Sequence, residues 1–229
     1  MAEVAPNRRP SFQTRRPLLM ALEAPRAAFE AQTLVPAWPL LSLAPRGDGH
    51  GVLVLPGFMA SDRSTRVLRR FLLDRGYAAH GWGLGRNLGT EDGLGSRLRA
   101  RLLELSLRHG GRLSLVGWSL GGVFARELAK RLPERVRQVI TLASPFGGPA
   151  AAPPPVPSTA IYTRSDGIVA WQACREPEGA QTENLEIVGS HCGLGFHPLA
   201  LYAIADRLAQ PLGDWKPFDR GGWRGALYR

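Results

Sequence analysis

The chain has 229 residues, 44% of them hydrophobic, which suits one large globular domain and excludes wholesale disorder. The formal net charge is +10 at pH 7, which we interpret as a solvated basic surface, with contact with an anionic membrane as the alternative; no motif indicates a specific nucleic-acid partner. No apolar run approaches the ~20 residues that cross a bilayer and no signal peptide is visible, so we expect a cytoplasmic protein.

The N-terminal part divides into two segments by composition. Residues 1–16 are polar and arginine-rich without periodicity, so we expect a flexible basic tail. Residues 17–48 are expected to hold a helix over 18–34, interrupted at Pro25, and then a linker. Packing of this helix on the domain is the plain interpretation, and a helix lying in a membrane interface is the other.

Residues 49–210 show short apolar strands alternating with amphipathic helices. The stretches that begin as strands are 51–57, 77–85, 112–117, 136–145, 159–169 and 183–191, and the helical ones are 65–77, 98–111, 119–136 and 197–210. This alternation predicts one α/β domain with a mostly parallel central sheet and helices on both faces. Residues 211–229 follow as an aromatic and basic tail, which either packs on the domain or binds a partner.

The stretch from 113 to 123, LSLVGWSLGGV, places a serine between a strand and a helix. Residues 117–121 fit the pattern G-x-S-x-G in the strand–turn–helix setting of a nucleophile elbow. The small residues two before and two after Ser119 allow the tight turn that exposes its hydroxyl. The alternative is a serine that only caps the helix.

A base and an acid must follow the serine in chain order if the hydroxyl is to act as a nucleophile. His191 directly follows an apolar strand, whereas His197 precedes Pro198 and is interpreted as a polar residue at a helix start. Asp166 is the acid that directly follows a strand, and a plain turn aspartate is its alternative interpretation. We therefore predict Ser119, Asp166 and His191 as the catalytic residues.

An acyl-transfer site also needs two hydrogen-bond donors for the oxyanion. The amide of Leu120, directly after the serine, is one candidate. The loop after the first strand supplies the other, with Gly57 allowing the turn and Phe58 providing the amide. Met59 is the fallback if that loop is shifted by one residue.

These motifs together resemble those of α/β-hydrolases of the lipase and esterase type. The matching stretches are LPGF at 55–58, GWSLGG at 117–122, LASPFGG at 142–148, SDGIV at 165–169 and GSHCGL at 189–194. The resemblance implies an α/β-hydrolase fold and a Ser-Asp-His triad, and it implies no metal or organic cofactor. The sequence departs from the family at Pro56, where many relatives carry histidine before the oxyanion glycine.

The segment 145–159 corresponds to the region where relatives often insert a cap of several helices. Here it is short and consists mostly of Pro, Ala and Gly. We therefore expect no substantial cap domain and an open, shallow site. Met59, Trp118 and Trp171 are the side chains expected to form an apolar wall for the acyl group.

Cys174 and Cys192 are the only two cysteines, and neither lies in a CxxC pair, so a structural zinc site is not expected. Cys174 follows the acid loop and Cys192 follows the candidate base directly. Two alternatives stay open: a disulfide joining the acid and base loops, or two free thiols in a reducing compartment.

The sequence as a whole predicts a serine carboxylic-ester hydrolase that works through an acyl-enzyme intermediate. Its substrate would be a small-molecule, lipid or polymeric ester. An acyltransferase using the same triad is one alternative. A non-catalytic module that binds a membrane or another partner is the other.

Overall fold

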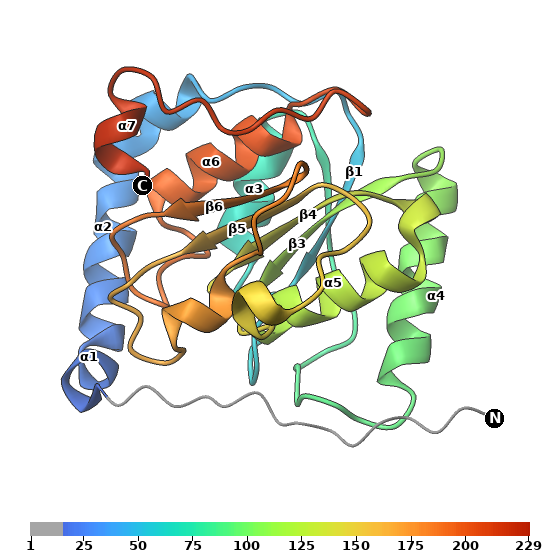
Figure 1. Cartoon of the computed structure of the whole chain (residues 1–229), viewed down its shortest axis with the longest axis horizontal. Coiled ribbons are helices and arrows are strands. Elements are labelled where there is room, and N and C mark those ends of the chain that lie inside the picture. The colour runs from blue at the N-terminus through green and yellow to red at the C-terminus, as the bar shows by residue number, and fades with distance from the viewer. Residues whose placement is uncertain (1–15) are drawn as a thin grey trace.

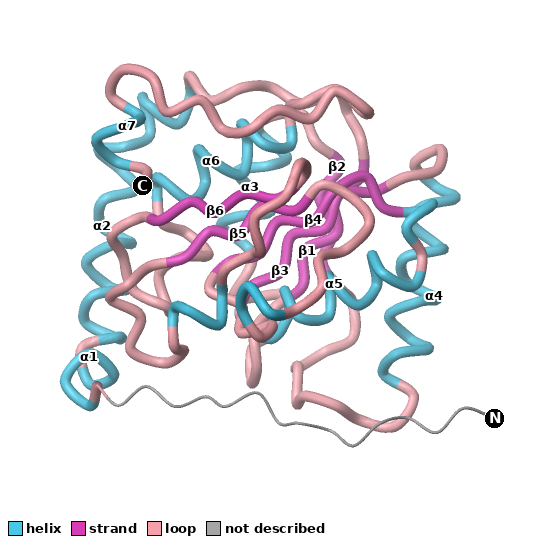
Figure 2. Tube along the Cα trace, viewed as in Figure 1, coloured by secondary structure: helices cyan, strands magenta, loops and turns pink. Residues whose placement is uncertain are grey.

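The computed structural model describes residues 16–229, so nearly all of the basic tail predicted for 1–16 lies outside the described residues. Six strands form one sheet in the order β2-β1-β3-β4-β5-β6, and every neighbouring pair is parallel. They are β1 (Gly51–Leu55), β2 (Ala78–Gly81), β3 (Leu113–Trp118), β4 (Val136–Leu142), β5 (Ser158–Tyr162) and β6 (Thr182–Glu186). The carboxyl ends of all these strands therefore lie at one edge, as the arrows in Figure 1 show, and Figure 2 shows the strands side by side in the sheet.

Helices cover both faces of this sheet, which confirms the predicted α/β architecture (Figure 1). One face carries α3 (Arg66–Asp74) and α6 (Pro198–Leu208), and the other carries α4 (Leu94–Arg108) and α5 (Leu120–Arg131). The remaining helices are α1 (Pro17–Ala21), α2 (Glu23–Ser42) and α7 (Arg224–Leu227). None of the described helices is long and apolar enough to cross a membrane.

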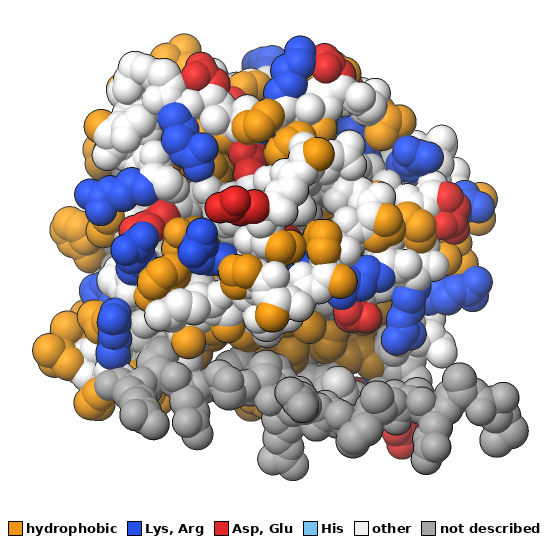
Figure 3. Space-filling model, viewed as in Figure 1, with side chains coloured by type: hydrophobic (Ala, Val, Ile, Leu, Met, Phe, Trp, Pro, Cys, Tyr) orange, Lys and Arg blue, Asp and Glu red, His pale blue; other side chains and the backbone are white. Residues whose placement is uncertain are grey.

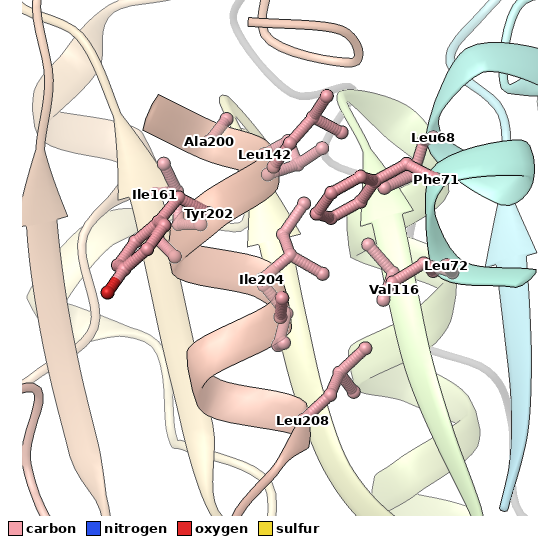
Figure 4. Close-up of a cluster of buried hydrophobic side chains, with 14 of the residues drawn as sticks. Leu68, Phe71, Leu72, Val116, Leu142, Ile161, Ala200, Tyr202, Ile204 and Leu208 are labelled. Carbon is pink, nitrogen blue, oxygen red and sulfur yellow. The ribbon is translucent and has the colours of Figure 1, made fainter. Parts of the chain in front are cut away.

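Two apolar cores lie on the two faces of the sheet because successive side chains of a strand point to opposite sides. In β1, Val52 and Val54 join the core under α3 and α6, whereas Leu53 and Leu55 join the core under α4 and α5. Figure 4 shows the first core, where Phe71 of α3 meets side chains of α6 and the central strands. Both cores hold the strands rigidly below the loops at the carboxyl edge.

The N-terminal helix differs from its prediction in its boundaries. The helix is interrupted at Leu22, not at Pro25. Helix α2 then continues to Ser42 and includes two further prolines, Pro36 and Pro39. Pro25 is tolerated because it is the third residue of α2, where the backbone N–H has no partner within the helix. Figure 1 shows α1 and α2 at the end of the sheet toward which β5 and β6 point.

The connector between β4 and β5 contains no helical cap, as predicted. Its one helical piece among the described residues is a short 3₁₀ turn, Gly148–Ala150. A buried ion pair between Arg126 and Glu176 lies beneath the connector, and the Arg126 guanidinium stacks on Phe146 at 3.8 Å. Arg126 also donates to the carbonyl of Ala152, so these contacts hold the connector against α5.

The C-terminal tail packs on the domain. Phe218 and Tyr228 are buried in the core on the α6 side. The last residue, Arg229, exchanges two backbone hydrogen bonds with Glu186 at the end of β6. Of the two interpretations of this tail, packing on the domain is the one that the structure bears out.

On the face shown in Figure 3, lysine and arginine side chains are spread out with acidic side chains among them. The excess of positive charge does not gather into a single block there. This distribution is typical of a solvated basic surface.

Candidate active site

Three of the predicted residues lie in loops at the carboxyl edge of the sheet. Ser119 follows β3, Asp166 follows β5 and His191 follows β6. All three are nearly buried, with exposed fractions of 7%, 3% and 5%. The parallel sheet therefore brings residues that are far apart in sequence to the same end of the molecule.

Ser119 occupies a strained turn between β3 and α5. Its backbone angles are φ 53° and ψ −123°, a conformation that L-residues rarely adopt and that costs about 1–3 kcal/mol. Its amide donates to the carbonyl of Leu142 at 2.7 Å, which ties the turn to β4. The hydroxyl makes no capping hydrogen bond to α5, so the interpretation of Ser119 as a helix cap is wrong.

The glycines around Ser119 are needed because backbone segments approach closely there. A Cβ on Gly117 would overlap the backbone of Gly122, and a Cβ on Gly121 would overlap the carbonyl oxygen of Leu55. Any side chain at either position would push α5 away from the sheet. The G-x-S-x-G pattern is thus explained by packing of the elbow.

Asp166 and His191 form a buried hydrogen-bonded pair. The Nδ1 atom of His191 lies 2.7 Å from Oδ2 of Asp166. The other carboxylate oxygen, Oδ1, accepts hydrogen bonds from the amides of Ile168 and Val169 at 2.8 and 2.6 Å. Asp166 is therefore more than a turn residue, because its second oxygen points to an imidazole from another loop.

Trp118 connects the serine turn with the loop of His191. Its indole Nε1–H donates to the carbonyl oxygen of His191 at 3.0 Å. A Cβ on Gly195 would touch the indole ring, so the base loop lies directly on Trp118. This contact places His191 beside the residue that precedes Ser119.

The loop after β1 lies against Ser119 on its other side. A Cβ on Gly57 would lie 3.2 Å from Ser119 Cβ and 3.8 Å from Oγ. The amide of Phe58 donates no hydrogen bond within residues 16–229, whereas the amide of Met59 donates to Asn87 at 2.7 Å. Phe58, and not the fallback Met59, therefore has the available amide.

The amide of Leu120 is the second available donor. Leu120 is the first residue of α5, so its N–H has no partner within the helix. The N-terminal end of a helix also carries a partial positive charge. Phe58 and Leu120, the two residues predicted to donate to an oxyanion, thus both have an amide that is not hydrogen-bonded to another described residue.

Asn87 is a buried residue at this site that the sequence analysis missed. Its side-chain amide donates to the carbonyl of Pro56 at 2.9 Å, and its backbone binds both Met59 and Ala60. Asn87 therefore fixes the loop that carries Phe58. A single asparagine in a glycine-rich stretch gives no sequence signal for such a role.

The predicted acyl-wall residues lie in different settings. The side chain of Met59 is exposed, whereas the indole N–H of Trp118 donates a hydrogen bond to the loop that carries His191. Trp171 stacks on Tyr162 with ring centroids 5.8 Å apart, and the guanidinium of Arg164 lies over the Trp171 ring at 4.8 Å from its centroid. Contact of any of these side chains with an acyl group stays a prediction.

The two cysteines are free thiols, not the disulfide that was one of two alternatives. Cys174 is buried with Tyr162 and Val169, whereas the amide of Cys192 binds the carboxylate of Glu23. Burial and the nearby Glu23 charge raise the pKa of Cys192 to about 11. Its thiol therefore stays protonated at neutral pH and is a poor nucleophile.

His197 serves as a helix cap, as the sequence analysis interpreted it. Its Nδ1 accepts a hydrogen bond from the amide of Leu199 at 3.2 Å, at the start of α6. Burial lowers the pKa of His197 to about 4. The imidazole is therefore neutral at physiological pH, and its acceptor nitrogen is already used.

This burial predicts a pH dependence of stability. Between about pH 6.5 and pH 4 the unfolded chain binds a proton at His197 and the folded chain does not, so stability is lost as the pH falls. We expect the free energy of unfolding of the wild type, relative to His197→Asn, to drop by about 2–3 kcal/mol over that range. Urea denaturation of both proteins at several pH values measures this difference. Parallel curves would contradict the assignment.

The fold was compared with those of known proteins. No protein-family model and no curated protein sequence matches the chain. Among solved structures, Aspergillus fumigatus lipase B is similar with 18% identity and a TM-score of 0.56, over 72% of this chain and 54% of that chain. The chain thus spans about half the length of that lipase.

Two further solved structures are similar. One belongs to work on LipS and LipT, metagenome-derived lipolytic enzymes, with 17% identity and a TM-score of 0.51, over 66% of this chain and 88% of that chain. The other is the pyrethroid hydrolase PytH, with 14% identity and a TM-score of 0.55, over 72% of this chain and 99% of that chain. At these identities the likeness shows the fold, which confirms the predicted α/β-hydrolase architecture.

Proposed function

We propose that the protein is a serine carboxylic-ester hydrolase with Ser119 as nucleophile, His191 as base and Asp166 as the acid that orients the base. The observation that carries this proposal is the buried His191–Asp166 hydrogen bond of 2.7 Å on loops at the same sheet edge as the strained serine. The lipolytic and hydrolytic names of the structural neighbours agree with it.

The mechanism follows from the tautomer that Asp166 selects. If Oδ2 of Asp166 accepts the proton on Nδ1, the Nε2 atom of His191 carries no proton and would take that of Ser119. The serine oxygen then attacks the ester carbonyl, and His191 returns the proton to the leaving alcohol. Water attacks the acyl-enzyme in the same way and releases the acid.

The negative oxygen of the tetrahedral intermediate needs two donors. The amides of Phe58 and Leu120 would provide them, since each is available, Leu120 follows Ser119 and Phe58 follows Gly57, which lies against Ser119. Because no helical cap separates β4 from β5, the acyl chain would lie in an open groove beside the exposed Phe58 and Met59. We propose esters with short or medium acyl chains, or a polymeric ester, as substrates.

A phosphonate ester that labels serine hydrolases tests the proposal directly. We expect stoichiometric labelling of the peptide that contains Ser119, because the phosphorus mimics the tetrahedral intermediate. Mass spectrometry of the digested protein locates the label. A protein that stays unlabelled, or that is labelled at another residue, would contradict the proposal and favour a non-catalytic module.

A panel of p-nitrophenyl esters of graded chain length tests the open site. We expect rates that vary smoothly with substrate concentration and show no jump where a short ester passes its solubility limit. The physical reason is that no cap has to open at an interface. A sharp rise at that limit would contradict the open site without affecting the assignment of Ser119.

A further inference from the structure

Helix α2 buries charged side chains and exposes apolar ones. Glu23 and Glu30 are only 4% and 7% exposed, whereas Phe29, Val35 and Trp38 are exposed on the same helix. An ordinary packing helix does the opposite, because burying a carboxylate costs free energy unless hydrogen bonds replace its water. The buried carboxylates of α2 therefore need partners on the body of the protein.

Those partners are the two loops that carry Asp166 and His191. The Oε1 atom of Glu23 accepts a hydrogen bond from the amide of Gly167 at 2.7 Å, one residue after the acid. Its Oε2 atom accepts from the amide of Cys192 at 2.9 Å, one residue after the base. One carboxylate thus bridges the backbone segments next to both members of the hydrogen-bonded pair.

Two further side chains of α2 strengthen this attachment. Arg26 donates to the carbonyl of Ser165 at 2.8 Å and to its hydroxyl at 2.9 Å, and it also donates to the carbonyl of Gly189. Glu30 accepts from the amide and the hydroxyl of Ser190 at 2.7 and 2.8 Å. Spacings of three and four residues place these side chains on one face of the helix.

The packing around Glu23 and Glu30 also depends on glycines. A Cβ on Gly167 would overlap the backbone of Leu19 in α1, and a Cβ on Gly193 would overlap the Glu30 carboxylate. The acid and base loops therefore approach the N-terminal helices more closely than other side chains would allow. The fit between these segments is specific in shape as well as in hydrogen bonding.

We propose that Glu23 is a positioning residue that holds the acid loop and the base loop in the register needed for the Asp166–His191 hydrogen bond. The catalytic consequence of this inference rests on the proposed function. A carboxylate suits the role because each of its two oxygens accepts a hydrogen bond, whereas an amide would turn an N–H donor toward one of the two backbone amides. Loss of one attachment lets one loop move relative to the other.

The test compares Glu23→Gln with Glu183→Gln. Glu183 is a matched control because its carboxylate is also buried and also accepts a backbone amide, that of Phe218, but it lies near the start of β6. With p-nitrophenyl butyrate we expect kcat of Glu23→Gln to fall about 10–100-fold with KM unchanged, because misplacement of about 1 Å costs that much. We expect kcat of the folded Glu183→Gln protein to stay within about twofold of the wild type. Within the described part of the chain, Glu183 does not contact the loops that carry Asp166 and His191, so these loops keep their geometry.

Hydrogen exchange gives a second readout that needs no activity. We expect the amides of Gly167 and Cys192 to lose protection together in Glu23→Gln and to keep it in Glu183→Gln. Should Glu23→Gln not fold, Glu23→Asp replaces it, because the shorter side chain keeps the charge but reaches only one loop. Unchanged protection, or a kcat no lower than that of the control, would overturn the proposal.

The two readouts separate this inference from the proposed function. If the wild type hydrolyses esters but Glu23→Gln opens neither loop, the positioning role fails and the proposed function stands. If the wild type hydrolyses no ester, the proposed function fails, and the exchange result alone decides whether Glu23 joins the loops.

Discussion

Ser119→Ala is expected to abolish ester hydrolysis, lowering kcat by a factor on the order of 10⁵–10⁶. The thiol of Cys192, next to His191 in the chain, is not expected to replace the hydroxyl, because burial raises its pKa to about 11 and keeps it protonated at neutral pH. The fold should be unaffected, because the hydroxyl makes no capping hydrogen bond to α5. Initial rates with p-nitrophenyl butyrate and a thermal unfolding curve measure both effects.

Ser106→Ala is the matched control for this change. Ser106 is also a buried serine, but its hydroxyl binds the carbonyl of Gly111 at the end of α4. Its removal should leave kcat nearly unchanged. Ser119→Ala protein that kept a tenth of the wild-type rate would rule out Ser119 as the nucleophile.

Asp166→Asn is expected to lower kcat at neutral pH by about 10⁴-fold while leaving KM nearly unchanged. The reason lies in the three hydrogen bonds of this carboxylate. Oδ1 must remain an oxygen because it accepts from the amides of Ile168 and Val169, so the new NH₂ group has to replace Oδ2. It would then donate to Nδ1 of His191 and leave the proton on Nε2, where the imidazole can no longer act as a base.

Kinetics across the pH range and a proton NMR spectrum of the imidazole N–H signals check this expectation. Asp62→Asn serves as the control, because Asp62 accepts the amides of Trp82 and Gly83 at 3.0 and 3.1 Å and binds no histidine. An Asp166→Asn protein as active as that control would show that Asp166 is a turn residue only.

The fold and three of the candidate residues could be predicted from the sequence because their signals are local. Apolar runs of strand length alternate with amphipathic helices, and that pattern by itself leads to a parallel sheet. Ser119 directly follows β3, and Asp166 and His191 lie in the loops that follow β5 and β6. Because parallel strands all end at the same edge of the sheet, three loops that each follow a strand lie at that edge.

The role of the N-terminal helix could not be predicted, because its contacts join residues far apart in sequence. Glu23 meets Gly167 across 144 residues and Cys192 across 169. The apolar periodicity of this segment instead indicated an apolar packing face, and Pro25 indicated a break. Tertiary packing overrode the first signal, since hydrogen bonds to two loops made burial of the carboxylates favourable. The second failed for a local reason, because Pro25 lies in the first turn of α2.

The sequence by itself determined which residue types stand at the carboxyl ends of the strands, because strand and turn propensities act over a few neighbours. Only the tertiary structure decided which backbone groups those residues meet. The availability of the Phe58 amide depends on Asn87 capturing that of Met59, and the state of the cysteines depends on which loop each thiol faces. These contacts depend on packing between segments that are distant in sequence, so they cannot be predicted from any short stretch of it.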